Sequence, residues 1–86
     1  MARYRIEVSS TAERQLRKLD HDSRVRVLRA IQSLASDPQP PGCRKLQGYD
    51  DVFRIRAGHF RILYSIDGRR VIVTVLKVGH RRDVYR

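Results

Sequence analysis

The sequence has a single cysteine and no apolar run long enough to cross a membrane. Cys43 has no second cysteine with which to form an intrachain disulfide, and no Cys/His cluster has the spacing of a zinc site. The longest apolar stretch is VIVTVL, and the opening residues, MARYRIEV, lack the apolar region of a signal peptide. We therefore expect a cytoplasmic protein with no metal, no cofactor and no membrane partner.

Glycine and acidic residues are also few. The five glycines are scattered, which excludes a glycine-rich loop that cradles phosphates. The 9 acidic residues supply no second carboxylate near the basic residues of the sheet described below, so we expect no mechanism based on paired carboxylates. Any chemistry must come from basic and aromatic side chains.

Positive charge is what the sequence has in excess. There are 19 Lys and Arg residues, 16 of them Arg, and the formal net charge is +10. Residues 1–43 have 8 basic and 5 acidic residues, whereas residues 44–86 have 11 basic and 4 acidic residues. The planar fork of arginine matches phosphate, so this bias favours a polyanion such as nucleic acid as partner. A basic surface that serves only solubility is the alternative.

The first 37 residues predict a strand followed by two helices. RYRIEV alternates apolar and polar residues, which is typical of a strand with one buried face. Ser10 followed by Glu13 has the spacing of a capping box, and Asp22 is the expected cap of a second helix. Apolar residues then recur at helical spacing until Pro38 ends the pattern. The two helices are expected to form a hairpin.

From residue 44 the chain predicts strands: RKLQG, DVFRIRA, FRILYSI and RVIVTVLKV. Asp67-Gly68 is a strong signal for a two-residue hairpin, and Gly58-His59 is a weaker one. The expected fold is a single α+β domain, residues 1–86. It has an N-terminal strand, a two-helix hairpin and then an antiparallel sheet of three to four strands, with the helices on one face.

The two turns fix a trial strand register, with Arg56 opposite Arg61 and Arg61 opposite Thr74. In this register the arginines share one sheet face with Leu63, Ile72 and Leu76, whereas Lys77 lies on the opposite, core-facing side. Like charges directly opposite each other are destabilising, so two facing arginines indicate a place for an anion. Alternatively, the arginines splay into water or pair with Asp50 and Asp51. The opposite face is apolar: Phe53, Ile55, Phe60, Ile62, Tyr64, Val71, Val73 and Val75.

The second half of the chain resembles the RelE/ParE superfamily of toxins from toxin–antitoxin modules. The stretches that carry the resemblance are KLQGYDDVFRIRAGHFRILYSID and VLKVGHRRDVYR, and the similarity extends over nearly the whole chain. It implies one of two activities. RelE-type members are ribosome-dependent endoribonucleases that cut mRNA in the ribosomal A site, whereas ParE-type members inhibit DNA gyrase. A basic RNA-binding module without activity is the third possibility.

The resemblance also implies which residues form the site. Arg54 and Arg56 match two basic positions of the site strand, Arg61 matches the arginine of the next strand, and Arg81 and Tyr85 match the terminal arginine and tyrosine. ParE-like chains usually lack this complete set, so the RelE branch is favoured. RelE-type proteins often have lysine at the positions of Arg54 and Arg56, and arginine is a poor general base because it stays protonated.

The expected reaction is attack of the RNA 2′-hydroxyl on the adjacent phosphate, without a metal. It needs a base, cations for the phosphorane and an acid for the leaving 5′-oxygen. Arg56 and Arg61 suit the second role, and Arg81 suits the second or the third. His80 and Tyr85 are the candidate bases, because histidine as a type titrates near pH 6.5 and arginines would lower the pKa of Tyr85. The expected RNA- or phosphate-binding residues are Lys45, Arg54, Lys77 and Arg82.

The resemblance implies three partners. One is a cognate acidic antitoxin that covers the site and forms a toxin–antitoxin hetero-oligomer with the toxin. The others are the 70S ribosome and the mRNA that it holds, because so small a site is not expected to hold free mRNA in cleavage geometry unaided.

Overall fold

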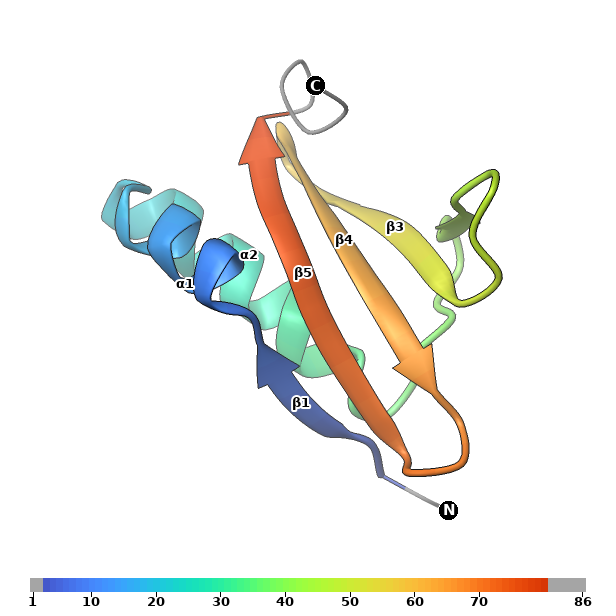
Figure 1. Ribbon diagram of the computed structural model, residues 1–86. Coiled ribbons are helices and arrows are strands. Elements are labelled where there is room, and N and C mark those ends of the chain that lie inside the picture. The colour runs from blue at the N-terminus through green and yellow to red at the C-terminus, as the bar shows by residue number, and fades with distance from the viewer. Residues whose placement is uncertain (1–2, 81–86) are drawn as a thin grey trace.

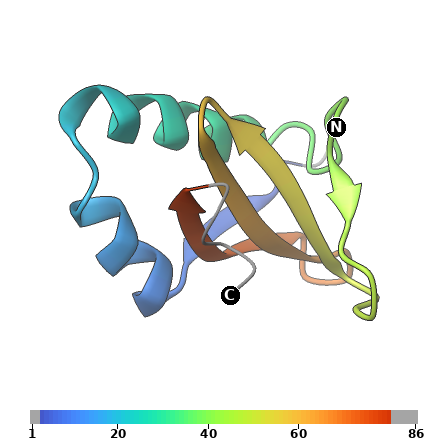
Figure 2. The ribbon, with the colours of Figure 1, turned by 90° about the horizontal axis from the view of Figure 1, so that it is seen from above.

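The structure is a computed structural model that describes residues 3–80 of the 86-residue chain. In chain order its elements are β1 (Arg5–Val8), α1 (Ser10–Arg17), α2 (His21–Ser33), β2 (Arg44–Lys45), β3 (Val52–Ala57), β4 (Phe60–Asp67) and β5 (Ile72–His80). The five strands form one sheet in the order β1–β5–β4–β3–β2, in which β1 is parallel to β5 and the other neighbours are antiparallel. Both helices lie on the same side of this sheet (Figure 1; Figure 2). The predicted α+β fold is confirmed.

Helix α1 begins one residue earlier than its capping signal predicted. The hydroxyl of Ser9, not Ser10, accepts a hydrogen bond from the Ala12 amide at 3.1 Å, and the backbone of Ser9 is extended as a cap requires. Glu13 does not reach back to form a capping box. Its carboxylate instead forms an ion pair with Arg17, 2.6 Å away on the next turn.

Helix α2 is likewise capped by Asp20 rather than by the predicted Asp22. The Asp20 carboxylate accepts a hydrogen bond from the Ser23 amide at 3.1 Å. The sequence has two aspartates separated by His21, and Asp20, whose backbone is extended, takes the cap position. The guanidinium of Arg24 then links the two helices, because it donates to the carbonyls of Leu16 and Arg17 at the end of α1 and to that of Leu19 in the connection.

The two predicted hairpin turns have different outcomes. Ala57 pairs with Phe60, so the β3–β4 turn is the predicted two-residue turn. The β4–β5 turn is wider than predicted, because Asp67 pairs with Ile72 and leaves residues 68–71 in the loop. The predicted pairing of Arg61 with Thr74 is therefore wrong, and Arg61 lies opposite Gly79. The Asp67 carboxylate accepts hydrogen bonds from the amides of the two arginines that follow Gly68, and Val71 adopts a positive φ of 59°. The Asp-Gly signal located this turn correctly but not its length.

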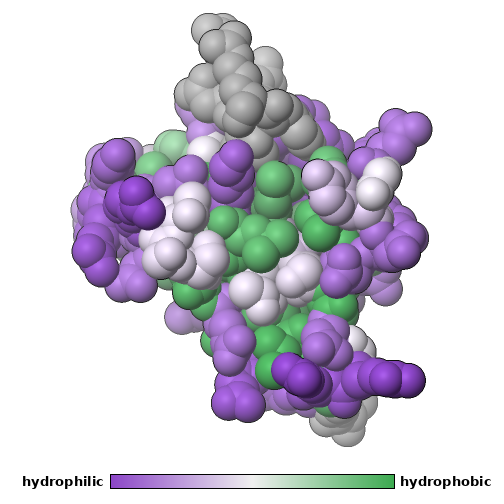
Figure 3. Space-filling view, viewed as in Figure 1, coloured by the Kyte–Doolittle hydropathy of each residue, from purple (hydrophilic) through white to green (hydrophobic). Residues whose placement is uncertain are grey.

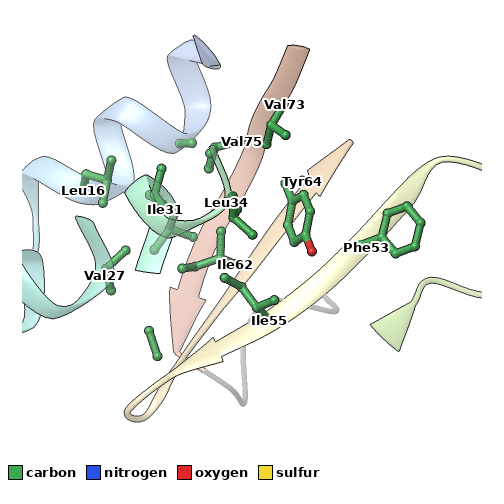
Figure 4. Packing of buried hydrophobic residues seen from close by; sticks show 13 residues of the cluster. Leu16, Val27, Ile31, Leu34, Phe53, Ile55, Ile62, Tyr64, Val73 and Val75 are labelled. Carbon is green, nitrogen blue, oxygen red and sulfur yellow. The ribbon is translucent and has the colours of Figure 1, made fainter. Parts of the chain in front are cut away.

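The hydrophobic core lies between the sheet and the two helices (Figure 4). The predicted core-facing residues of β3, β4 and β5 are buried, except that Phe60 is only partly buried and Val71 lies in the turn instead of the sheet. No helix among residues 3–80 is long and apolar enough to cross a membrane. The core cluster consists of Ala12, Leu16, Val27, Ile31, Leu34, Phe53, Ile55, Ala57, Ile62, Tyr64, Val73, Val75 and Val78.

Tyr64 contributes the one hydroxyl group of this core cluster. Its side chain is fully buried, and the hydroxyl donates a hydrogen bond to the Pro38 carbonyl at 2.7 Å. Burial raises the pKa of Tyr64 well above the ordinary value, and the nearby Cys43 raises it further. Tyrosine ionises at about pH 10 in the unfolded chain. Tyr64 therefore contributes its full stabilisation of the fold below about pH 10, and this contribution is lost as the pH rises further.

We expect Tyr64→Phe to lower the free energy of unfolding by about 1 kcal/mol at pH 7, because the hydrogen bond to Pro38 is lost. The difference from the wild type should shrink at pH 10.5, where only the wild type must keep a buried phenol protonated. Denaturant unfolding of both proteins at the two pH values measures this. A difference that does not change with pH would contradict the assignment.

Candidate nucleic-acid interface

The sheet face that the helices leave uncovered carries four arginines. Arg56 lies directly opposite Arg61 across β3 and β4, as predicted from the turn between them. Arg44 lies directly opposite Arg54 across β2 and β3. Because side chains alternate along a strand, and the intervening residues of β3 are in the core, all four arginines point to the other face. We call this the arginine face.

The arginine face brings like charges close together. Arg61 is half-buried and its Nε atom is shielded from solvent, whereas Arg56 is exposed. Within residues 3–80, neither Arg44 nor Arg56 forms an ion pair with a carboxylate. Directly opposed cations repel each other, so the arrangement gains stability from a bound anion. Two guanidinium forks on one face fit the oxygens of a phosphodiester.

Lys77 also lies on the arginine face, which corrects its predicted position. It pairs with Leu63, which in turn pairs with Arg54, so Lys77 extends the row of Arg44 and Arg54 across the sheet. Strict alternation of side chains along the predicted strand placed Lys77 on the core-facing side of the sheet. A β-bulge between β4 and β5, at Leu63/Tyr64, leaves one extra residue in β5 and reverses the parity of the residues after it.

Helix α1 holds the strand edge at this bulge. Strand β1 pairs with β5 only as far as Val75. Beyond that point the Ser9 hydroxyl donates to the Leu76 carbonyl at 2.9 Å, and the Gln15 side-chain carbonyl accepts from the Val78 amide at 2.7 Å. The side chains of the α1 N-cap, Ser9, and of Gln15 within α1 thus replace the missing strand partner and fix the backbone on both sides of Lys77.

We expect Gln15→Met to lower the free energy of unfolding by about 1–3 kcal/mol, because the partly buried Val78 amide loses its acceptor. Methionine keeps the length of the side chain, so little packing is lost. Thermal or denaturant unfolding measures the loss, and hydrogen exchange of the Val78 amide should become faster. Unchanged exchange at this amide would show that Gln15 does not hold the edge.

His80 ends β5 and faces away from the arginine pair. It pairs with Phe60, which shares the core-facing parity of β4. The His80 ring meets the Phe60 ring edge-on, with 6.0 Å between centroids, and stacks with the His59 ring at 6.3 Å. The sequence predicted His80 as a candidate base beside the arginines. The strand continues through His80, and its pairing with Phe60 places the His80 side chain on the sheet face opposite to the arginine face.

Of the remaining predicted residues, the structure describes Lys45 but not the three that follow His80. Lys45 pairs with Phe53, so it takes the core-side parity at the exposed edge of the sheet instead of joining the arginine face. Arg44 was not among the predicted site residues, although the register of β2 with β3 places it directly opposite Arg54. Arg81, Arg82 and Tyr85 lie outside the described residues.

An apolar patch borders the cations on the same face. Figure 3 shows it over β4 and β5, surrounded by hydrophilic side chains. The register assigns to this face Leu63, which is buried, and Ile72, which is half-buried. The half-buried Leu76 is the extra residue of the bulge and has no partner in β4. The arginine face therefore combines cations, which can contact phosphates, with aliphatic surface.

Comparison with known proteins points to one group. Residues 6–85 match the model of a family described as the ParE toxin of the type II toxin–antitoxin system parDE. The chain is 33% identical over 84 residues to toxin RelG of Mycobacterium tuberculosis, and the match covers 96% of this chain and 97% of RelG.

Solved structures agree in fold. The archaeal RelE–RelB complex from Pyrococcus horikoshii contains a chain with a TM-score of 0.82 and 26% identity, and the match covers 98% of this chain and 100% of that chain. The toxin–antitoxin complex RelBE2 of Mycobacterium tuberculosis gives a TM-score of 0.80 and 31% identity, covering 92% of this chain and 99% of the other.

Proposed function

Because the chain belongs to the ParE toxin family of type II toxin–antitoxin systems, within the RelE/ParE superfamily, we propose that it is a ribosome-dependent endoribonuclease. In this proposal it works in the cytoplasm and cuts mRNA in the ribosomal A site, which stops translation. The observation that carries the proposal is the Arg56–Arg61 pair, two facing guanidinium groups on the sheet face that the helices leave open.

The proposed reaction uses the RNA as its own nucleophile. A base removes the proton of the 2′-hydroxyl, the oxygen attacks the adjacent phosphorus, and the bond from phosphorus to the 5′-oxygen breaks. Arg56 and Arg61 stabilise the additional negative charge of the phosphorane. Arg61 is the stronger of the two, since its half-buried guanidinium acts in a lower dielectric than the exposed one of Arg56. Arg81 protonates or stabilises the leaving oxygen.

Two residues remain candidates for the base, His80 and Tyr85. The strand pairing of His80 with Phe60 favours Tyr85, whereas only His80 is a side-chain type that titrates near neutrality. The pH dependence of single-turnover cleavage decides between them. A histidine base predicts a rate that falls below about pH 6, and a tyrosine base predicts a rate that still rises above pH 8.

The partners in this proposal are the ribosome, its mRNA and an acidic antitoxin. Structures of related toxins were solved in complex with RelB antitoxins. The net charge of +10 supports an acidic partner here too, in a toxin–antitoxin hetero-oligomer that blocks the arginine face.

The test of the proposal compares mRNA on translating ribosomes with the same mRNA free in solution. Cleavage that requires the ribosome supports the proposal. Equal cleavage of both mRNA samples would make the chain a general ribonuclease. Cleavage of neither would mean that the chain only binds RNA or acts on another target.

Inhibition of DNA gyrase is a second candidate function, because the family model that matches the chain is that of ParE. A supercoiling assay with purified gyrase tests it directly. Inhibition of supercoiling without ribosomal cleavage would favour this candidate over the endoribonuclease.

A further inference from the structure

The sheet edge at β2 has a hollow of about 370 Å³ that none of the proposed chemistry uses. The cross-strand pair Arg44 and Arg54 forms its charged side. The other lining residues are Lys45, Leu46 and Gln47, so two guanidinium groups and no carboxylate of the described residues line the hollow. Such a lining fits one phosphate group, which can accept hydrogen bonds from two guanidinium forks at once.

A second hollow of about 470 Å³ continues the first, since both are lined by Lys45, Leu46 and Gln47. Tyr49 lies in this second hollow and keeps 59% of its surface exposed. The loop that carries it is ordered by backbone hydrogen bonds from the Tyr49 amide to the Leu46 carbonyl and from the Leu46 amide to the Val52 carbonyl. An exposed aromatic ring on a fixed loop can stack on a nucleobase.

We propose that the two hollows form one nucleotide-binding subsite, in which Arg44 and Arg54 hold the phosphate and Tyr49 stacks on the base of an RNA nucleotide. Asp50 lines only the Tyr49 end. Its carboxylate repels phosphate from that end and can accept a hydrogen bond from a base amino group, which gives the nucleotide a direction. Both volumes lie in the range of about 300–1,000 Å³ that is usual for small ligands.

The subsite lies beside the proposed site of cleavage. Arg54 and Arg56 are two residues apart on β3, or about 7 Å along the strand. This inference rests on the proposed function in so far as an RNA-cleaving toxin brings RNA to the arginine face. The nucleotide can belong to the mRNA, next to the one that is cut, or to ribosomal RNA.

The test measures binding, without any cleavage. Tyr49→Trp introduces the chain's sole tryptophan, whose fluorescence should be quenched when a 2′-O-methyl RNA hexanucleotide stacks on it. Relative to the wild type, Tyr49→Ala should weaken binding of the hexanucleotide about 5- to 150-fold. Arg44→Gln should lower the slope of log affinity against log salt by about 0.7, the effect of one phosphate contact. Arg69→Gln, which removes the same charge from the exposed β4–β5 turn, should leave stacking unchanged.

A parallel measurement with empty ribosomes separates the two sources of RNA. If Arg44→Gln and Tyr49→Ala weaken binding of the hexanucleotide, the subsite takes an mRNA nucleotide. If they weaken only binding of empty ribosomes, it takes a ribosomal nucleotide. If neither affinity changes by more than twofold in variants with a wild-type melting temperature, the inference is overturned. A wild type that binds RNA here but never cleaves it would refute the proposed function and leave the subsite standing.

Discussion

Replacing Arg61 with glutamine is expected to slow ribosome-dependent cleavage of mRNA by about 100- to 1,000-fold, the usual effect of removing one group that stabilises transition-state charge. Arg61 faces Arg56 directly, and its Nε is shielded from solvent. Its charge is therefore screened less by water than that of an exposed arginine. Single-turnover cleavage on programmed ribosomes measures the effect. The loss should appear in the rate of the chemical step more than in ribosome affinity.

Two companion variants make this result specific. Arg61→Lys keeps the charge but loses the planar fork, so it should recover part of the rate. Arg69→Gln removes the same charge from the β4–β5 turn, about 20 Å away along β4, and should cut at the wild-type rate. If Arg61→Gln is folded and cuts mRNA as fast as the wild type does, the arginine pair is not the site of cleavage.

Replacing Lys77 with methionine is expected to slow cleavage by about 10- to 100-fold. The bulge puts Lys77 opposite Leu63 on the arginine face, one row of paired residues from the Arg56–Arg61 pair. At that distance of about 7 Å its charge attracts the RNA backbone and stabilises the phosphorane less than a direct contact does. The same cleavage assay measures the effect, and Lys77→Arg should keep most of the rate.

The Lys77 variant also tests the bulge itself. On the core-facing side that the sequence parity predicted, methionine would replace a buried charge by an apolar group and stabilise the protein without affecting cleavage. On the arginine face it should lower cleavage and change the free energy of unfolding by less than about 0.5 kcal/mol. A stabilised variant with full activity would contradict the observed register.

The parts of the fold that depend on local patterns were predictable from the sequence. The alternation in β1, the apolar stripes of the helices and the two-residue turn after Ala57 need only neighbouring residues to specify them. The Arg56–Arg61 pair followed from that turn, because a short hairpin fixes the register of its two strands. This is why the centre of the candidate site could be predicted from the sequence.

The parts that depend on distant residues were not predictable. The bulge in β5 needs Ser9 and Gln15, which lie more than 60 positions earlier in the chain, to satisfy its backbone groups. Because the bulge could not be predicted, the sheet face on which Lys77 lies could not be assigned correctly. The pairing of Arg44 with Arg54 was missed for a similar reason, because a loop of six residues joins β2 to β3 and no turn signal sets their register.

Primer extension on mRNA from translating ribosomes tests the central claim most directly, with the wild type and Arg61→Gln run side by side and gyrase supercoiling measured on the same preparations. Cleavage at the Arg56–Arg61 pair predicts discrete cuts at A-site codons with the wild type, far fewer with Arg61→Gln, and supercoiling unaffected by either. An absence of cuts with the wild type, together with inhibited supercoiling, would contradict it and place the chain among the gyrase inhibitors.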